Sequence, residues 1–410
     1  MANDFNYGPE GSFGSFGSFG SFGSFGSFGS FGSFGSFGSF GSFGGPANPP
    51  MVSGALITNH DGIAGNWQAI PGNAVPAASE ETTAYLDRLS PSVRGSIFAL
   101  ELGSRIGFSH TPATATEDGW ANIFHLEIGD AATPGTKYQP LIKMRRPTQA
   151  IFAAQLTVVA NYADLRQDRI SEILAQLAAP TEFLRAIAFI EPARTPYTME
   201  LLAAAHWLAN YVEMRIKYAL DCKRPMEYSP QIQPMIWTPT HGALPSGHAT
   251  EAFTLARVLW RLLRDVDTGP AVPYSDGTWG EMMMRQAARI AINRTVAGVH
   301  FPVDSAAGAV LGLTLGRYFA DRCTGQEPAR SWTFDGSVYG NEDGASNPAL
   351  DFDWRRYYAP NDPAGGTAPV QSAPGDWVAD TAITGHLPNQ VHSDPLDWLW
   401  KKAAAEWAGF

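Results

Sequence analysis

Apolar residues recur at spacings of three and four through most of the chain, as they do on one face of an α-helix. Leu201, Ala205, Leu208 and Val212 form one such face. The spacing predicts helices over residues 148–163, 168–178, 181–190, 197–222, 248–265, 280–297 and 303–321. Period-two alternation, which would indicate strands, is scarce. We therefore predict a mainly α fold, built as one helical bundle or two fused bundles.

The flanking segments carry further helix signals. Ser79-Glu80-Glu81 is typical of a helix start, and the patterns over 93–105 and Pro395–Trp407 predict two more helices. The stretch 109–140 is rich in Thr, Gly and Pro, which predicts a loop. Within the helix 303–321, three glycines spaced by four share one face, where we expect close packing: Gly308, Gly312 and Gly316.

The N-terminal region has a repetitive composition. From residue 11 to residue 43 the tripeptide Gly-Ser-Phe occurs eleven times. Because Gly and Ser favour disorder, we predict a disordered tail and linker over 1–50. One helical domain is predicted over 51–410, with its motif-bearing core at 148–321 and with 322–410 wrapping over the bundle. Two interpretations of the repeat stay open, an expanded repeat without function and a tail for self-association.

Composition excludes several classes of protein. The net charge of −11 excludes a general nucleic-acid binder, so an anion site requires a local basic pocket. The only cysteines, Cys222 and Cys323, exclude a disulfide scaffold and a Cys-type zinc site. Neither a secretion signal nor an apolar stretch of about 20 residues is visible, which predicts a cytoplasmic protein without a membrane span. Charged residues make up only 16% and Trp is abundant, so we expect a homo-oligomer with buried interfaces.

Candidate chemistry begins with the pair Lys217 and Arg224, which are followed by Pro225. Seven residues are two helical turns, so a continuous helix would place both cations on one face. Such a pair suits a tetrahedral oxyanion. The alternative is that the two cations only compensate the dipole at the end of a helix.

A second segment runs from His241 to His248 and contains Pro-Ser-Gly just before an apolar helical run. The backbone amides at a helix N-terminus bind anions. Ser246 adds a hydroxyl donor, and Gly247 lets the backbone approach a ligand closely. His248 would then lie beside the anion, where it can transfer protons. An ordinary Ser N-cap with a surface histidine is the alternative.

The third segment contains Arg294, His300 and Asp304. Gly298 and Pro302 predict that the helix breaks between Arg294 and Asp304 and that a new helix begins. A carboxylate four residues after His300 can bind one imidazole nitrogen and leave the other as an acceptor, nucleophile or ligand. The alternative is a core histidine paired with an Asp at a helix start.

The series Lys-x6-Arg-Pro, Pro-Ser-Gly-His and Arg-x5-His-x3-Asp resembles the three-part signature of the type 2 phosphatidic acid phosphatase and vanadium haloperoxidase superfamily. The resemblance spans about residues 217–304 and implies a helical-bundle fold of that kind. Asn293 departs from the pattern, because the phosphatases usually have Ser there. Both branches use a site for a tetrahedral oxyanion, so the resemblance leaves two activities open.

In the haloperoxidase interpretation the resemblance implies orthovanadate as cofactor, with His300 as the one protein ligand of the metal. The vanadate oxygens would be held by Lys217, Arg224, Ser246, Gly247 and Arg294. His248 would act as acid-base and Lys217 would polarise the oxygen that the halide attacks. The partners would be hydrogen peroxide, a halide and a small organic acceptor.

In the phosphatase interpretation His300 attacks phosphorus, Asp304 orients the His300 imidazole, and His248 protonates the leaving oxygen. His241 favours the haloperoxidase, because the resemblance to bromoperoxidases includes a second histidine at this position, whereas a solvated loop histidine is the alternative. Met214, where haloperoxidases often have an aromatic residue, leaves the halide preference open; we expect bromide first, then iodide, then chloride. A third hypothesis is a Phe-repeat scaffold with a vestigial enzyme domain.

Overall fold

The computed structural model describes residues 50–64, 83–112, 119–128, 135–177, 180–266, 277–326, 330–359, 370–382 and 392–408. The Gly-Ser-Phe repeat therefore lies outside the described residues, as do residues 1–49 of the predicted tail. Of the segment at 79–81 that suggested a helix start, nothing is described. The residues after it form a short 3-10 helix, η3 (Thr83–Arg88), instead of an α-helix.

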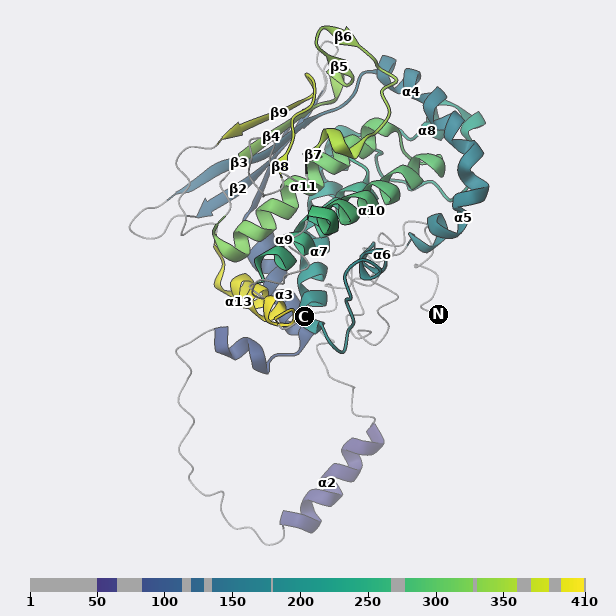
Figure 1. The fold of residues 1–410 in the computed structure, drawn as a ribbon. Coiled ribbons are helices and arrows are strands. Elements are labelled where there is room, and N and C mark those ends of the chain that lie inside the picture. The colour runs from purple at the N-terminus through teal and green to yellow at the C-terminus, as the bar shows by residue number, and fades with distance from the viewer. Residues whose placement is uncertain are drawn as a thin grey trace.

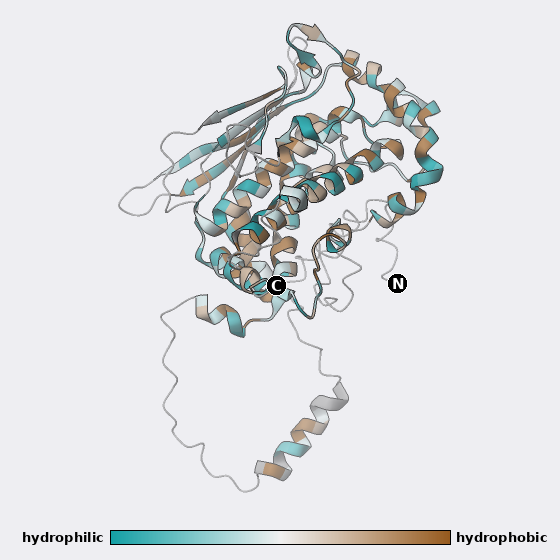
Figure 2. Cartoon of the chain, in the orientation of Figure 1, coloured by the Kyte–Doolittle hydropathy of each residue, from teal (hydrophilic) through white to brown (hydrophobic). Residues whose placement is uncertain are grey.

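Four long helices form the centre of the fold, and all four lie where the apolar spacing predicts them (Figure 1). They are α7 (Pro196–Leu220), α9 (Gly247–Asp265), α10 (Gly277–Val296) and α11 (Pro302–Thr324). Helix α9 packs against the other three. Prolines at the first helical position begin α7 and α11, where a missing N–H costs nothing. Figure 2 shows apolar and hydrophilic residues intermixed along these helices, and nearly every residue of α11 is buried.

Shorter helices make up the rest of the α-helical structure in the described ranges. They are α2 (Pro50–Ala64), α3 (Pro91–Gly103), α4 (Gln149–Asn161), α5 (Arg166–Ala175), α6 (Thr181–Arg185), α8 (Pro225–Tyr228) and α13 (Asp394–Ala405). The predicted helix 181–190 is too long, because its chain turns after Arg185 and the Arg185 Nε donates to the Ile190 carbonyl at 2.9 Å. The predicted final helix is confirmed as α13, which packs on α3, α7 and α11. None of the helices in the described ranges has both the length and the apolar composition that a membrane span requires.

The glycine face of α11 brings it close to α9, as its spacing predicts. A Cβ on Gly308 would lie 2.7 Å from the Ser246 carbonyl oxygen, and one on Gly316 would lie 2.7 Å from the Arg257 Cβ. Larger side chains at these positions would push the two helices apart. Close approach also allows the Ser246 amide to donate to the Asp304 carbonyl at 2.9 Å. The glycine face therefore holds the start of α9 against the start of α11.

The prediction of a mainly α fold is right only in part, because a five-stranded mixed sheet lies on one side of the helices (Figure 1). Its strands are β1 (Ile106–Thr111), β2 (Trp120–Ile128), β3 (Thr136–Arg145), β4 (Arg330–Asp335) and β9 (Val378–Ala382), in that order. Strands β3 and β4 are parallel and the other neighbours are antiparallel. The predicted loop 109–140 is therefore wrong, since three strands fall partly within it. The segment after α11 adds β4 and β9 to the sheet and two short ladders, β5 (Asn341–Glu342) with β6 (Ala345–Ser346) and β7 (Tyr358–Ala359) with β8 (Val370–Gln371).

The burial of side chains in β2 explains why the sequence shows no alternation of apolar and polar residues there. Its buried side chains are those of Ala121, Ile123, His125 and Glu127. Half of these are polar, while Phe124 on the other face is apolar, so no period-two pattern survives in the sequence. The Nδ1 of the buried His125 lies 2.8 Å from the Tyr318 hydroxyl of α11.

Candidate active site

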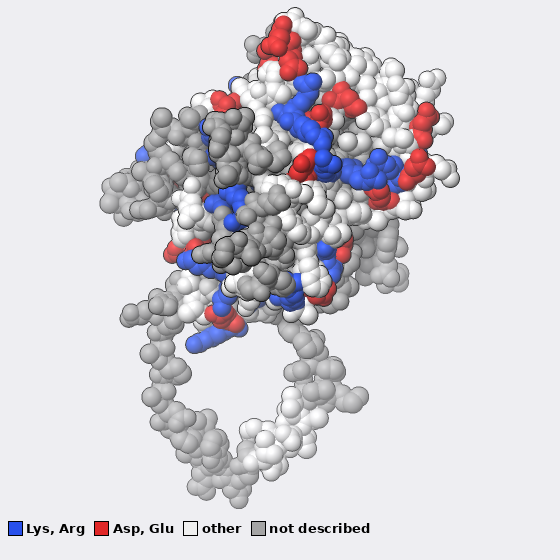
Figure 3. Space-filling model, in the orientation of Figure 1, with Lys and Arg blue, Asp and Glu red and all other residues white. Residues whose placement is uncertain are grey.

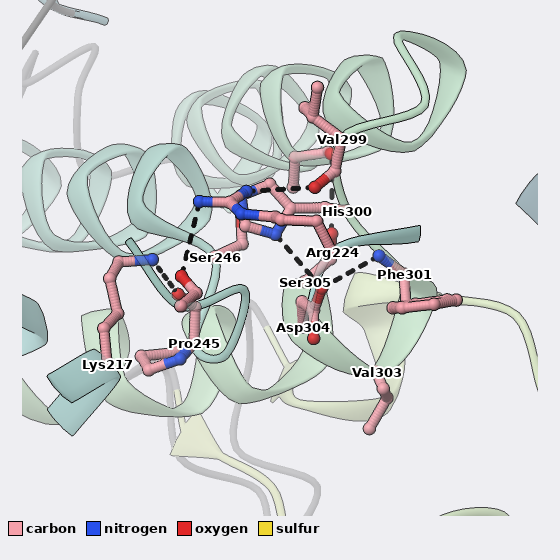
Figure 4. Close-up of polar contacts among 12 residues, drawn as sticks. Lys217, Arg224, Pro245, Ser246, Val299, His300, Phe301, Val303, Asp304 and Ser305 are labelled. Atoms are coloured by element: carbon pink, nitrogen blue, oxygen red, sulfur yellow. Dashed lines mark hydrogen bonds and ion pairs between the residues drawn. The ribbon is translucent and has the colours of Figure 1, made fainter. Parts of the chain in front are cut away.

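The first two cations are Lys217, in the last turn of α7, and Arg224, in the segment that follows this helix. They do not share the one helix face that the spacing predicted. Helix α7 ends at Leu220, and Asp221 takes a left-handed conformation with φ 44°. Arg224 is extended and precedes α8, so it does not share a helix face with Lys217. Both side chains are nevertheless 1% exposed and converge on one cluster (Figure 4). Lys217 Nζ donates to the Pro245 carbonyl, at the start of the second segment.

Arg224 and Asp304 orient the imidazole of His300. The Arg224 Nη1 lies 2.8 Å from the His300 Nε2, and the His300 Nδ1 lies 3.1 Å from the Asp304 Oδ2 (Figure 4). Because a guanidinium can only donate, Nε2 carries the lone pair and Nδ1 carries the proton that Asp304 accepts. Asp304 also accepts from the Phe301 amide at 2.9 Å. His300 therefore presents an unprotonated nitrogen, the state that a nucleophile or metal ligand requires.

The predicted break between two helices positions His300 in the turn between α10 and α11. Helix α10 ends at Val296, Gly298 takes φ 84°, and α11 begins at Pro302. A Cβ at Gly298 would also lie 2.8 Å from the Arg166 Nη2, so the turn tolerates only glycine. Arg294, before the break, and His300, after it, thereby both reach the cluster.

Ser246 does not act as an ordinary N-cap. It occupies the position before α9, yet its hydroxyl makes no capping hydrogen bond. The Ser246 Oγ is fully buried and has no hydrogen-bond partner in the described part of the chain. The first amides of α9, beginning with that of Gly247, have no acceptor within their own helix. This segment thus offers one hydroxyl and several amide donors at a helix N-terminus.

Gln176, which the sequence did not single out, connects the two remaining site residues. Its side-chain oxygen accepts from the Arg294 Nη2 at 2.9 Å and from the Asn293 Nδ2 at 3.0 Å. Its backbone oxygen lies 2.8 Å from the His248 Nε2. Since a carbonyl only accepts, His248 carries its proton on Nε2 and leaves Nδ1 unprotonated. A buried glutamine near the end of α5 has no sequence signal, because its partners are more than 70 residues away.

His241 joins the same cluster. Its Nδ1 lies 3.1 Å from the Arg224 Nη2, and its backbone oxygen accepts from the Arg224 Nε at 3.2 Å. The interpretation as a solvated loop histidine is therefore wrong. Direct contacts join Lys217, Arg224, His241, Ser246, His300 and Asp304, whereas Arg294 and His248 are joined to each other through Gln176.

Burial and three cations control protonation in the site. Burial, with Arg224 and Lys217 nearby, lowers the pKa of His300 well below its usual value. Burial and Arg294 lower the pKa of His248 to about 4. Burial, with Lys217 and Arg224, lowers the pKa of His241 to about 2. All three imidazoles are therefore neutral near pH 7.

Burial also shifts the pKa values of the other ionisable groups of the site toward their neutral forms. Burial lowers the pKa of Lys217 to about 8 and that of Arg294 to about 9, and it raises the pKa of Asp304 to about 7. Figure 3 shows Lys and Arg interleaved with Asp and Glu on one face of the molecule. The three site cations are instead buried at 1% exposure. The site is thus a concentrated positive region inside an acidic protein, which favours an anion.

These neutral histidines predict acid instability of the anion-free protein. His248 has a lower pKa folded than its ordinary 6.5, so the unfolded chain binds more protons between pH 6.5 and 4. The contribution of such a histidine to the free energy of unfolding is at its maximum above pH 6.5. It is expected to fall between pH 6.5 and 4, by about 1.4 kcal/mol per pH unit for each histidine whose pKa folding lowers. Urea titrations at pH 7 and 4.5 measure it. His248→Asn should show a smaller loss, and an equal loss would contradict this account.

The atoms of the site fit a tetrahedral oxyanion such as phosphate or vanadate. Besides the Ser246 Oγ, the Arg294 Nε and Nη1 are buried without a hydrogen-bond partner among the described residues. A buried polar group without a partner costs about 1–3 kcal/mol, so several of them around three cations indicate a site built for an anionic ligand. His300 Nε2 could ligate a metal at its edge.

Residues near the motifs behave differently. Tyr228 packs between Phe152 and Phe301 in the core. Glu227 accepts from the Arg224 amide at 2.6 Å, which fixes the backbone of that residue. Trp237, by contrast, is 78% exposed. Lys143 lies over the Trp120 ring at 3.9 Å, on the sheet.

Comparison with known proteins gives one family match and one structural likeness. The model of the PAP2 superfamily matches residues 199–322, so this part of the chain is a PAP2 superfamily domain and contains all three motif segments. The superfamily part of the resemblance is thereby confirmed. In structure, the chain is similar to the first transmembrane PAP2 type phosphatidylglycerolphosphate phosphatase from Bacillus subtilis. That likeness has 22% identity and a TM-score of 0.34, and it covers 41% of this chain and 84% of the other. No curated protein matches the sequence significantly.

Proposed function

We propose that this PAP2 domain binds orthovanadate and oxidises halide, preferably bromide, with hydrogen peroxide to hypohalous acid, which halogenates a small organic acceptor. The observation that carries the proposal is the contact of His241 with Arg224, 3.1 Å apart, beside His300. This contact adds an imidazole to a site that already has the donors for a tetrahedral oxyanion.

The residues of the chain have separate tasks in this proposal. Bound vanadate would supply a Lewis-acid centre that activates hydrogen peroxide, and the vanadium would keep its oxidation state throughout. His300 Nε2 would be its protein ligand, and Asp304 keeps the His300 proton on Nδ1. Lys217, Arg224 and Arg294 offset the anionic charge, and Ser246 and Gly247 donate hydrogen bonds. His248 Nδ1 is the atom that can take a proton from hydrogen peroxide.

A soluble phosphomonoesterase is the second candidate, and the His300–Asp304 pair favours it. A neutral imidazole held by a carboxylate is the arrangement of an activated histidine nucleophile. His300 would attack phosphorus, and Arg224 and Arg294 would offset the charge of the phosphoryl oxygens. His248, once protonated on Nδ1 from solvent, would give that proton to the leaving oxygen. The same anion donors serve both reactions.

One experiment separates the two functions. Purified full-length protein, freed of bound anions, is assayed for bromination of a phenol with hydrogen peroxide before and after addition of orthovanadate. The haloperoxidase proposal predicts activity only after addition. Hydrolysis of p-nitrophenyl phosphate, inhibited by orthovanadate and without any bromination, would support the phosphatase instead.

His241→Phe is expected to separate the functions within one protein. The phenyl ring keeps most of the volume but loses the contact with Arg224. We expect the vanadate-dependent kcat for bromide oxidation to fall by about tenfold or more, as for loss of a positioned imidazole. Inorganic phosphate should still bind, because the anion donors remain. Unchanged bromide kinetics would remove the main support for the haloperoxidase proposal.

A further inference from the structure

Glu213 is a buried carboxyl group at the edge of the site that neither the motifs nor the proposed reaction uses. It lies one turn before Lys217 on α7, so both side chains share a helix face. The Glu213 Oε1 lies 2.6 Å and the Oε2 3.4 Å from the place where a Cβ on Gly247 would stand. The carboxyl group therefore fills the space beside the first residue of α9, next to the amides that face an anion.

The carboxyl group lacks the partners of a structural ion pair. Glu213 is 2% exposed, and its Oε2 has no hydrogen-bond partner in the ranges that the structure describes. By contrast, Glu200 on the same helix binds Arg94 through both oxygens, at 2.5 and 2.9 Å. A buried polar atom without a partner, at the edge of an anion site, points to the ligand as its partner.

The charges around Glu213 decide which form it takes. Burial, the first cause, and the neighbouring Glu251 raise the pKa of Glu213 well above its usual value, and Lys217 and Arg224 oppose them only in part. An ionised carboxylate would also repel a bound oxyanion at short range. A neutral carboxylic acid instead has an O–H that can donate a hydrogen bond, as apolar sites can arrange.

We propose that Glu213 is a further residue of the oxyanion site and that its protonated carboxyl group donates a hydrogen bond to the bound anion. The inference rests on the proposed function only in requiring that the site hold a tetrahedral oxyanion; it applies to vanadate and to phosphate alike. It also accounts for glycine at position 247, since any side chain there would displace the carboxyl group.

The test measures binding of inorganic phosphate and of orthovanadate to the full chain by isothermal titration calorimetry. Glu213→Gln keeps a donor of the same shape and is expected to bind within about threefold of the wild type. Glu213→Met removes the donor and should bind at least tenfold more weakly, as expected for a hydrogen bond to a charged group. Glu200→Gln is the matched control on the same helix and should leave the affinity unchanged.

Some outcomes would overturn the inference, and others would overturn the proposed function. Wild-type affinity in Glu213→Met would leave Glu213 only a packing role. Tighter binding by Glu213→Gln, by tenfold or more, would mean that the carboxylate is ionised and opposes the anion. Oxyanion binding without bromide oxidation would refute the proposed function while leaving this inference intact, and a wild type that binds neither anion would refute both. Circular dichroism of each variant checks the fold.

Discussion

Replacing His300 with alanine is expected to abolish vanadate-dependent bromide oxidation and any phosphomonoester hydrolysis alike, with kcat falling by about a thousandfold or more. Asp304 holds the proton of His300 on Nδ1, which leaves Nε2 unprotonated as a ligand or nucleophile. Arg224 and Arg294 only donate, and His248, bound to Gln176 through Nε2, has a separate acid-base task in both reactions. Steady-state kinetics of the purified variant, with far-UV circular dichroism as a check on folding, measure the effect.

Two comparisons make the result specific. His125→Phe removes a buried imidazole on the sheet, where it contacts Tyr318 outside the site, and should leave kcat unchanged. Asp304→Asn keeps an oxygen near Nδ1 but loses the carboxylate, so we expect kcat to fall, but by less than in His300→Ala. If His300→Ala retained more than a tenth of the activity, the histidine would be neither ligand nor nucleophile.

The sequence predicts the central helices and the site much better than the sheet, and the reason is the range of the interactions. Helix α9 and the break at Gly298 are encoded by neighbours a few residues apart. Strand β2 hides its pattern because buried His125 depends on Tyr318, 193 residues along the chain. The parallel pairing of β3 with β4 likewise joins residues 190 positions apart, such as Ile142 and Trp332.

The pair Lys217 and Arg224 shows a correct conclusion from incorrect geometry. The spacing of seven suggested one helix face, yet α7 ends between the two residues at the left-handed Asp221. The turn carries Arg224 back to His241 and Val299, which hold its guanidinium through their backbone oxygens. Motif spacing therefore identified the residues, whereas their convergence depends on contacts that sequence spacing does not contain.

Function and stability oppose one another at Arg294. Burial lowers the pKa of this guanidinium to about 9, so the folded protein disfavours its charged form by several kcal/mol, at about 1.4 kcal/mol per unit. Its Nη2 binds Gln176 and Ile173, but Nε and Nη1 have no partner among the described residues. We expect this cost to be recovered only when an anion binds.

Arg294→Met is therefore expected to weaken the binding of inorganic phosphate and orthovanadate by about a hundredfold, since two charge-assisted hydrogen bonds are lost. The free energy of unfolding without anion should stay the same or rise, because methionine fills the space without a buried charge. Gln176 keeps its bond from Asn293. Calorimetry with each anion and urea unfolding without anion measure the two effects.

Arg322→Met is the matched control, because Arg322 is also 1% exposed but binds Glu101 far from the site. It should lower the free energy of unfolding and leave anion affinity unchanged, the opposite pattern to Arg294→Met. If Arg294→Met instead destabilised the anion-free protein and bound phosphate as tightly as the wild type, Arg294 would be a structural residue. The convergence of three cations on one oxyanion would then be lost as the basis of the site.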